Sequence, residues 1–313
     1  MPSIPRIHQL NTGAFIPSVG FGTWKLTNED QSGYNAIKTA IKSGYRHFDT
    51  AYGYQNESVV GRGIRDGLKE AGLKREDIFV TTKLAPICSR PANVKPAFER
   101  SLELLDIGYI DLYLIHWPVA LSPDSGELIP LKPDGTRDID EELKGQFEVT
   151  WAAMEKLIET GKVRSIGVSN FSIHNLERLL ASAKVVPAVN QIEGHPYLPQ
   201  FELLDYCASK NIHITQYSPL GSSNGEVLKD PTLVQIAEKY QVSVAQIIIS
   251  WGALRGSTIP KSSNPSRIQS NIQTVDLTDE DIKTINDISK THTKRYLKPD
   301  WGVPVFDEDF KNL

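Results

Sequence analysis

The sequence GYRHFDTAYGY spans residues 44–54. Its apolar pattern predicts a strand over 46–49 that ends on Asp49, and the small residues that follow predict a loop that presents Tyr54. A carboxylate at the carboxyl end of a strand, followed by a phenol on a turn, is suited to acid–base chemistry at the rim of a sheet. This stretch therefore predicts a sheet with a reactive edge.

Two later strands end on polar residues in the same way. Residues 78–82 lead into Lys83, and residues 111–115 lead into His116. An amine and an imidazole thus join the acid and the phenol at or just past successive strand ends. We interpret the set as one constellation rather than as separate motifs.

Short apolar runs alternate with amphipathic stretches along most of the chain. The predicted strands are 18–22, 46–49, 78–83, 111–116, 164–169, 187–191, 212–217 and 257–260. The predicted helices are 29–43, 57–71, 92–105, 147–160, 173–182, 200–210, 231–240 with 243–254, 265–271 and, before the tail, 279–290. Residues 7–16 precede them as a hairpin. Eight strand-then-helix units in unbroken alternation predict an α/β protein, a (β/α)8 TIM barrel with an N-terminal β-hairpin and a C-terminal tail.

A doubly wound parallel sheet is the structural alternative. That fold usually carries a phosphate-binding glycine loop after its first strand. The sequence Gly61-Arg62-Gly63 resembles part of such a loop, but it lies inside a predicted helix and lacks the third glycine. We therefore favour the barrel.

Size and composition limit the function classes. A chain of 313 residues could form two domains, but α/β barrels of this length fold as one, so we expect a single domain over 1–313. The net charge of -4 gives no electrostatic reason to expect nucleic acid or an anionic membrane as a partner. No apolar run approaches the roughly 20 residues of a membrane helix, and the first six residues lack the apolar core of a signal peptide. Cys88 and Cys207 have no motif spacing, so we expect reduced thiols in a cytoplasmic protein, which nothing in the pattern requires to be more than a monomer.

Two segments depart from the compact alternation. Residues 119–146 form a long connection rich in Pro, Gly and charge, and such loops on a barrel rim usually shape the substrate site. The tail at 295–313 contains Trp301 and Phe306 and is too apolar for a purely solvated terminus. It either packs on the barrel wall or folds over the mouth, and the sequence does not decide between the two.

The strand-end residues suit the reduction of a carbonyl group. In a parallel barrel all carboxyl ends face one rim, so Asp49, Lys83 and His116 converge, and Tyr54 is close enough in sequence to reach them. Hydride addition creates an alkoxide, which needs a proton donor, and we assign that role to Tyr54. We expect Lys83 to lower the pKa of Tyr54, Asp49 to balance the charge of Lys83, and a neutral His116 to orient the carbonyl oxygen.

Each of these residues has a purely structural interpretation as well. Asp49 would cap a turn, Lys83 would be a solvated charge, and His116 and Tyr54 would be packing residues. Taken singly, each structural interpretation is the more common one. Four complementary groups at one rim favour the catalytic site.

The same residues carry a resemblance to the aldo-keto reductases, which extends from Gly22 to Asn271. The stretches that match are 22–25 (GTWK), 44–57, 109–118 (YIDLYLIHWP), 167–171 (GVSNF), 190–193 (NQIE), 217–221 (YSPLG) and 259–262 (IPKS). The resemblance implies the barrel fold, and it implies that Asp49, Tyr54, Lys83 and His116 form the catalytic tetrad of that family.

A nicotinamide cofactor is expected because Cys and His never cluster at metal-ligand spacing and no flavin motif is present. Tyr217 offers an aromatic face for the nicotinamide ring, and Lys261 and Arg267 provide cations for a 2′-phosphate, which favours NADP(H). The alternative is that these two cations are ordinary helix-flanking charges, but the resemblance places the matching residues on that phosphate. Ser169, Asn170 and Gln191 are expected to bind the carboxamide, and Ser218, Leu220 and Ser222 the pyrophosphate. The predicted cofactor set is completed by Thr23, Trp24, Asp49, Ser262 and Asn271.

The sequence departs from the family pattern at three places. Ser270 stands where relatives often have an acid that contacts adenine, and Ala85 replaces a frequent tryptophan near the pocket. The segment 222–228 is short beside the belt that fastens the cofactor in aldose-reductase-like members. From the short segment we predict faster cofactor exchange.

The predicted partner is a small carbonyl substrate, bound by Trp24, Tyr54, His116 and Trp117. Within the family the chain is similar to reductases of glyceraldehyde, sugars and xenobiotic aldehydes. Oxidation of a polyol is the same chemistry in reverse. The functional alternative is an NADP-binding regulatory subunit, as in potassium channels; a crystallin-like structural protein on the same barrel is a third class.

Overall fold

Eight parallel strands form the central sheet of the computed structural model, which describes residues 4, 6–27, 31–222 and 225–310. The strands are β3 (Phe21–Gly22), β4 (His47–Asp49), β5 (Phe79–Leu84), β6 (Ile110–Ile115), β7 (Val163–Ser169), β8 (Val189–Glu193), β9 (His213–Tyr217) and β10 (Ser257–Thr258). They lie side by side in chain order, and every pairing is parallel. This order has no reversal, so the doubly wound alternative is excluded.

The sheet closes on itself just before β3. Val19 forms a parallel bridge with Thr258, and the Gly20 amide donates to the Thr258 carbonyl at 2.8 Å. A Cβ on Gly20 would lie 2.8 Å from Cγ2 of Ile259, the residue after β10, and 2.5 Å from Nδ1 of His47. Glycine at this position therefore lets the first and last strands meet, and the predicted (β/α)8 barrel is confirmed.

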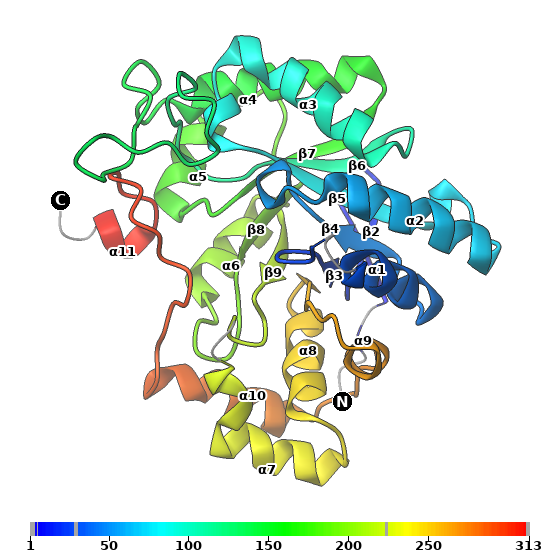
Figure 1. The fold of residues 1–313 in the computed structure, drawn as a ribbon. Helices are drawn as coiled ribbons and strands as arrows, with labels where there is room; N and C mark the ends of the chain where they lie inside the picture. The colour runs from blue at the N-terminus through cyan, green and yellow to red at the C-terminus, as the bar shows by residue number, and fades with distance from the viewer. Residues whose placement is uncertain (1–3, 5, 28–30, 223–224, 311–313) are drawn as a thin grey trace.

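Helices surround this barrel (Figure 1). They are α1 (Ser32–Lys42), α2 (Glu57–Ala71), α3 (Pro91–Leu105), α4 (Phe147–Glu155), α5 (Ile173–Leu180), α6 (Phe201–Ser209), α7 (Pro231–Tyr240), α8 (Val244–Leu254), α9 (Pro265–Asn271), α10 (Asp279–Asp287) and α11 (Asp307–Phe310). Six 3-10 turns are described: η1 (Tyr52–Tyr54), η2 (Arg75–Asp77), η3 (Pro86–Cys88), η4 (Lys156–Thr160), η5 (Glu226–Lys229) and η6 (Ile288–Lys290). None of the described helices is long and apolar enough to cross a membrane.

The predicted helices agree closely with the observed ones. The boundaries 57–71 and 265–271 match α2 and α9, whereas 147–160 and 279–290 each divide into an α-helix followed by a 3-10 turn. The predicted start of the first helix at Glu29 lies outside the described residues, and α1 begins at Ser32.

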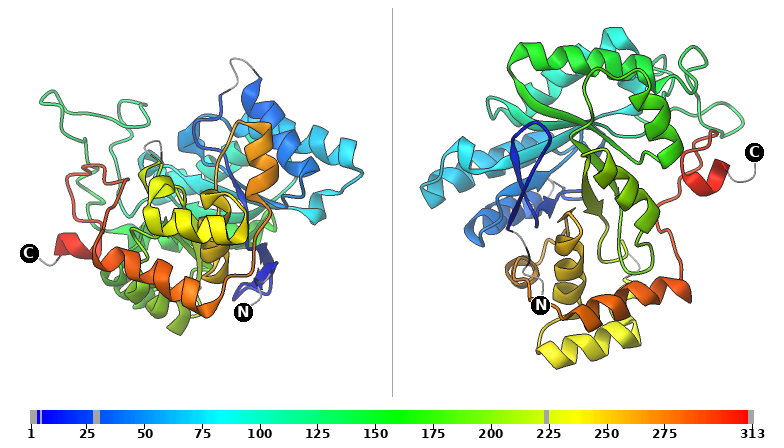
Figure 2. Two further views of the ribbon diagram at one scale, coloured as in Figure 1. Left: turned by 90° about the horizontal axis from the view of Figure 1, so that it is seen from below. Right: turned by 180° about the vertical axis from the view of Figure 1, so that it is seen from behind.

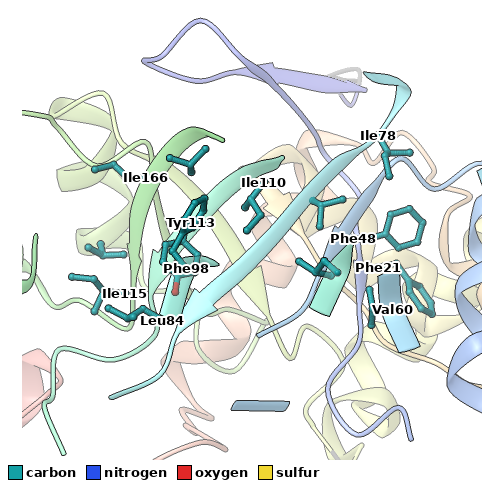
Figure 3. Close-up of a cluster of buried hydrophobic side chains, with 14 of the residues drawn as sticks. Phe21, Phe48, Val60, Ile78, Leu84, Phe98, Ile110, Tyr113, Ile115 and Ile166 are labelled. Carbon is teal, nitrogen blue, oxygen red and sulfur yellow. The ribbon is translucent and has the colours of Figure 1, made fainter. Parts of the chain in front are cut away.

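The strand period of two residues separates the core from the site. Phe48 of β4 and Tyr113 of β6 point outward and pack with Phe98 of α3 and other apolar side chains between the sheet and the helices (Figure 3). The neighbours of Phe48, which are His47 and Asp49, consequently face the interior of the barrel. The sequence alternation thereby delivers a carboxylate to the barrel mouth.

The N-terminal hairpin closes the end of the barrel opposite the mouth. Strands β1 (Ile7–Gln9) and β2 (Phe15–Pro17) pair antiparallel, as predicted. Ile16 is fully buried in a cluster with Phe79 and Val189, which begin β5 and β8. Figure 2 shows the hairpin lying across the strands when the molecule is seen from behind.

The C-terminal tail packs against the long connection 119–146, and the two segments lie side by side in Figures 1 and 2. Trp301 and Phe306 of the tail form an apolar cluster with Trp117, Leu121 and Ile139. The tail lines the cavity described below, so it folds over the barrel mouth. Its last residues, 311–313, lie outside the described part of the chain.

Candidate active site

A cavity of about 660 Å³ opens at the carboxyl ends of the barrel strands. With one exception, every site residue predicted from the sequence lines it: Thr23, Trp24, Asp49, Tyr54, His116, Trp117, Ser169, Asn170, Gln191, Tyr217, Ser218, Leu220, Ser222, Lys261, Ser262, Arg267 and Asn271. The exception is Lys83, which is fully buried directly beneath the cavity floor. The topology therefore gathers residues from all eight strand ends into one space.

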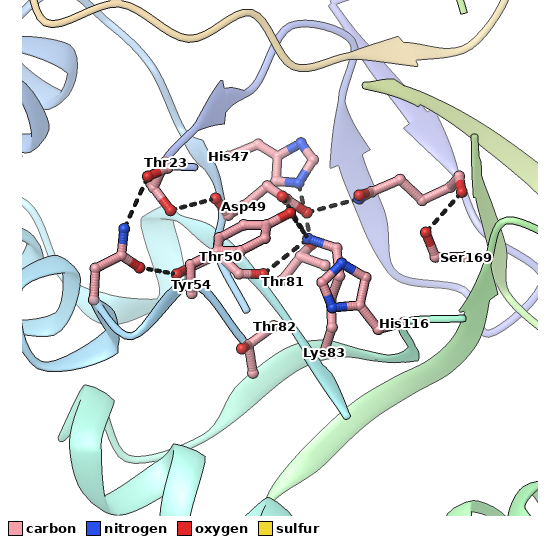
Figure 4. A network of polar contacts seen from close by, with 12 residues as sticks. Thr23, His47, Asp49, Thr50, Tyr54, Thr81, Thr82, Lys83, His116 and Ser169 are labelled. Carbon is pink, nitrogen blue, oxygen red and sulfur yellow. Dashed lines mark hydrogen bonds and ion pairs between the residues drawn. The ribbon is translucent and has the colours of Figure 1, made fainter. Parts of the chain in front are cut away.

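The Lys83 ammonium is the centre of a fully bonded polar network (Figure 4). Its Nζ donates to Oδ1 of Asp49 at 2.6 Å, to the carbonyl of Thr50 at 2.9 Å and to the hydroxyl of Tyr54 at 3.3 Å. These three bonds use all three ammonium protons. The amine thus has one fixed position, beneath the phenol.

Asp49 is held on both carboxylate oxygens. Oδ1 accepts from Lys83, and Oδ2 accepts from Nε2 of Gln191 at 2.7 Å. Burial raises the pKa of Asp49 and lowers the pKa of Lys83, while their ion pair opposes both shifts. Because both carboxylate oxygens and all three ammonium protons are hydrogen-bonded, we treat the two residues as an ion pair at neutral pH.

The phenol of Tyr54 is protonated at neutral pH. Burial, with the Asp49 carboxylate as a second cause, raises the pKa of Tyr54 well above its ordinary value. The net shift is therefore opposite to the lowering expected from Lys83, because burial of the phenol and the Asp49 carboxylate both raise this pKa. A protonated phenol is the form that can donate.

His116 faces the phenol from the neighbouring strand end. The two rings meet edge to face with centroids 5.6 Å apart. Burial, followed by the charge of Lys83, lowers the pKa of His116 well below its ordinary value, so the imidazole is neutral. This agrees with the neutral role predicted for it.

The three residues expected to bind a carboxamide are bonded to one another. Ser169 Oγ donates to the carbonyl of Gln191 at 2.8 Å, and Asn170 Nδ2 donates to the carbonyl of His116 at 3.0 Å. Oδ1 of Asn170 accepts from the hydroxyl of Tyr217 at 2.7 Å. Asn170 has a φ of 64°, a left-handed conformation that asparagine tolerates better than most residues. These bonds fix the Asn170 side chain beside the Tyr217 ring.

The opposite end of the cavity is strongly positive. Lys261, Arg267 and Lys25 all line it, and no ion pair joins any of them to a carboxylate within the described residues. Partial burial, followed by repulsion from Lys25 and Arg267, lowers the pKa of Lys261. Cations that repel one another in a cavity are stabilised by a bound anion such as a phosphate dianion.

The substrate half of the cavity has mostly apolar walls. Trp117 is nearly buried and packs on Trp301 with ring centroids 5.1 Å apart, whereas Trp24 remains 41% exposed at the edge. Ala85 lines the wall, so the space that a tryptophan would fill there belongs to the cavity. The expected apolar cleft above a polar floor is present.

Several site residues were not identified from the sequence. Asn56 donates to the carbonyl of Thr23 at 2.8 Å and accepts from Thr50 at 2.9 Å, so it ties the loops after β3 and β4 together. Its position just before a helix was the only signal available. The unpredicted lining residues include Lys25, Leu128, Ile129, Arg137, Leu297, Pro299 and Trp301.

The segment 222–228 is only partly described. Ser223 and Asn224, on which the prediction of a short cofactor belt depends, lie outside the described residues. Ser222 and Leu228 on either side both line the cavity.

Comparisons with known proteins agree with this geometry. The model of the aldo/keto reductase family matches residues 18–290. An aldehyde reductase of Saccharomyces cerevisiae is 47% identical over 308 residues, which cover 95% of this chain and 96% of the relative. A glycerol 2-dehydrogenase (NADP(+)) of the same yeast is 45% identical over 306 residues, covering 95% of each chain. The solved structure of aldose reductase from Giardia lamblia superposes with a TM-score of 0.87 at 38% identity, covering 93% of this chain and 98% of that one.

Proposed function

The chain belongs to the aldo/keto reductase family, and we propose that it reduces aldehydes and ketones to alcohols with a proton supplied by Tyr54. It is an NADP(H)-dependent oxidoreductase by its family and its relatives. The observation that carries the finer proposal is the contact of a buried ammonium with the hydroxyl of Tyr54 at the floor of the cavity.

The described residues fit NADP(H). The cations Lys261 and Arg267 would hold the 2′-phosphate, and the ring of Tyr217 would stack on the nicotinamide. Ser169, Asn170 and Gln191 would bind the carboxamide. When bound, the reduced cofactor supplies a hydride to the carbonyl carbon.

Tyr54 completes the reduction by protonating the carbonyl oxygen. As the π electrons move onto oxygen, Oη of Tyr54 donates its proton and the alcohol forms. The phenolate left behind is stabilised by the Lys83 ammonium, whose Nζ lies 3.3 Å from Oη. The neutral His116 donates a hydrogen bond to the carbonyl oxygen and holds it toward Tyr54.

The apolar walls suit aldehydes broadly, and the likeness to reductases of glyceraldehyde, sugars and xenobiotic aldehydes adds those carbonyls to the proposed substrates. Because the same groups return the proton in reverse, the enzyme also oxidises the corresponding alcohols. The cellular ratio of NADPH to NADP sets the direction. We further propose that the protein acts as a monomer of one domain, 1–313, in the cytoplasm.

A panel of carbonyl compounds, with NADPH consumption as the readout, tests this function. We expect turnover of aromatic aldehydes and of glyceraldehyde. An NADP-binding regulatory subunit, the second candidate, would bind NADPH and turn over none of them. Binding of NADPH with no turnover across the whole panel would therefore reject the reductase.

A further inference from the structure

Glu193 ends β8 and is fully buried, yet the proposed mechanism does not use it. Its Oε1 accepts from the amide of Tyr296 at 2.7 Å and from Nε2 of His195 at 2.8 Å, and its Oε2 accepts from the amide of Leu297 at 2.8 Å. Burial alone would raise the pKa of Glu193, but these hydrogen bonds outweigh it and hold the pKa below its ordinary value. The side chain is therefore a buried anion that holds two consecutive amides at the start of the tail.

Tyr296, the first of these two residues, supports the loop after β9. A Cβ on Gly221 would lie 3.2 Å from Cε2 of Tyr296, so the ring packs against this loop. Leu220 and Leu228 pack on the same apolar cluster as Tyr296, and both line the cavity. Since Leu220 was predicted to bind the pyrophosphate, the ring of Tyr296 supports the wall of the cofactor half.

Leu297, the next residue, belongs to the substrate half of the cavity. Its side chain lines the cavity and packs against the apolar cluster that contains Trp117 and Trp301. Trp117 directly follows His116 and was predicted to contact the substrate. Two consecutive residues thus support different halves of the cavity, and one carboxylate fixes the backbone of both.

We propose that Glu193 is a positioning residue shared by cofactor and substrate, whose carboxylate holds one wall of each half of the cavity through two adjacent amides. Hydrogen bonds to an ionised acceptor are roughly twice as strong as neutral ones. Glutamine at this position would turn an NH2 group, which can only donate, toward N–H groups that also donate. The proposal rests on the proposed NADPH-dependent reduction and adds a residue that supports binding of both reactants.

The test compares Glu193→Gln with the native enzyme, with benzaldehyde as the substrate and fluorescence titration for the Kd of NADPH. We expect the Kd of NADPH and the KM of benzaldehyde each to rise at least about fivefold, because the charge-assisted bonds to both walls are lost. The single-turnover rate at saturating NADPH and benzaldehyde should stay within about threefold, as for a loss of binding alone. Within the described residues, no hydrogen bond joins Glu193 to Asp49, Tyr54, Lys83 or His116.

Two further variants test the two walls one at a time. Tyr296→Leu keeps the amide that Glu193 holds but removes the ring, so it should raise the Kd of NADPH and leave the KM unchanged. Leu297→Ala should raise the KM and leave the Kd unchanged. These two variants decide the question even if Glu193→Gln does not fold.

The control is Asp309→Asn, which alters another carboxylate that anchors the tail. Asp309 accepts from the amides of Val305 at 3.2 Å and Phe306 at 3.0 Å, and it does not line the cavity. This variant should leave the Kd of NADPH unchanged, because neither amide belongs to a residue that packs against the loop after β9.

The shared role of Glu193 is overturned if folded Glu193→Gln changes only one of the two constants, or neither. It is also overturned if Tyr296→Leu raises the KM as much as the Kd, or if Asp309→Asn weakens NADPH as strongly as Glu193→Gln does. A native enzyme that binds no NADPH, or that binds it without turning over any aldehyde, would instead reject the reductase itself.

Discussion

Lys83 and Asp49 show how a single buried ion pair serves both the fold and the site. Both side chains are essentially inaccessible, and each is bonded on every polar atom that the network offers. A buried pair is costly to desolvate, but removing one partner is costlier, because a lone charge remains in the interior. The benefit that offsets this desolvation cost is the fixed position of the Lys83 ammonium beneath Tyr54.

Asp49→Asn is expected to lower the free energy of unfolding by about 3–5 kcal/mol, since it leaves the ammonium of Lys83 without its counter-charge. The double variant Asp49→Asn with Lys83→Met removes both charges and should recover part of that loss. Urea unfolding of the two variants checks this. If the double variant is instead less stable than Asp49→Asn alone, the two charges do not depend on each other, and the prediction is contradicted.

Lys261 and Arg267, at the positive end of the cavity, give a second prediction for individual residues. Lys261→Ala combined with Arg267→Ala should weaken NADPH binding at least about tenfold while changing NADH binding little, because only NADPH carries the 2′-phosphate. Titration of intrinsic fluorescence with each cofactor measures both affinities. Lys283→Ala, on the exposed face of α10, is the control for net charge, and an unchanged NADPH preference in the double variant would refute the placement.

Sequence reasoning succeeded best for residues at strand ends. Asp49, Lys83 and His116 follow from the alternation of the strands, because a period of two residues and a parallel barrel leave one direction for each side chain. The upward shift of the Tyr54 pKa could not be predicted from the strand pattern. It depends on how completely the phenol is buried, which only the packed loops determine.

At the scale of elements, Gly61 is required for helix packing, although the Gly61-Arg62-Gly63 sequence is not a phosphate-binding loop. It lies inside α2 where that helix crosses the end of α3, and a Cβ there would come within 1.9 Å of the carbonyl oxygen of Leu105. The glycine pattern near it thus reflects helix packing instead of phosphate binding.

Gly61→Ala should destabilise the protein by about 1–3 kcal/mol, although alanine favours an isolated helix, because the backbone of α3 must move to admit the methyl group. Thermal and urea unfolding provide the measurement. Lys69→Ala, exposed on the same helix, is the matched control and should be nearly neutral. A stabilised Gly61→Ala variant would show that the two helices separate without cost.

The position of the C-terminal tail against the long connection could not be predicted from the sequence. Their contact depends on Trp117, Ile139 and Trp301 meeting across a large separation in sequence, and no local period encodes such a meeting. A buried carboxylate anchors the start of the tail, since Glu193 at the end of β8 accepts from the amides of Tyr296 at 2.7 Å and Leu297 at 2.8 Å. Arg137 was not predicted to line the cavity for the same reason, because its position there depends on this packing.

For the whole molecule, the interior of the barrel contains histidines that do not line the cavity and are neutral when folded. His213 lies 4.9 Å from His8, ring centre to ring centre, and bonds to Ser257, while His47 bonds to Thr81. Burial lowers the pKa of His47 and of His213 to about 3 in each case. Acid therefore acts on the barrel through buried histidines that do not line the cavity.

Stability should be complete above the unfolded histidine pKa of about 6.5 and should fall as the pH drops from there toward 3, because the unfolded chain binds protons that the folded one excludes. Each of the two residues contributes a slope of about 1.4 kcal/mol per pH unit in that window. Urea midpoints at pH 7.5 and pH 5 measure the difference. His213→Gln should reduce the difference between the two midpoints, whereas His292→Gln, at an exposed position, should leave it unchanged. Equal stability of the native protein at both pH values would contradict the account.

The central claim is that Tyr54 donates the proton while Lys83, beneath it, holds its hydroxyl in place. The most direct measurement is the single-turnover rate of NADPH oxidation by an aromatic aldehyde in Tyr54→Phe, with Tyr52→Phe from the same turn as the control. We predict a fall of at least about a hundredfold in Tyr54→Phe with NADPH affinity retained, because loss of a positioned acid removes 10²-fold or more. A Tyr54→Phe rate within a few-fold of the Tyr52→Phe rate would contradict the claim.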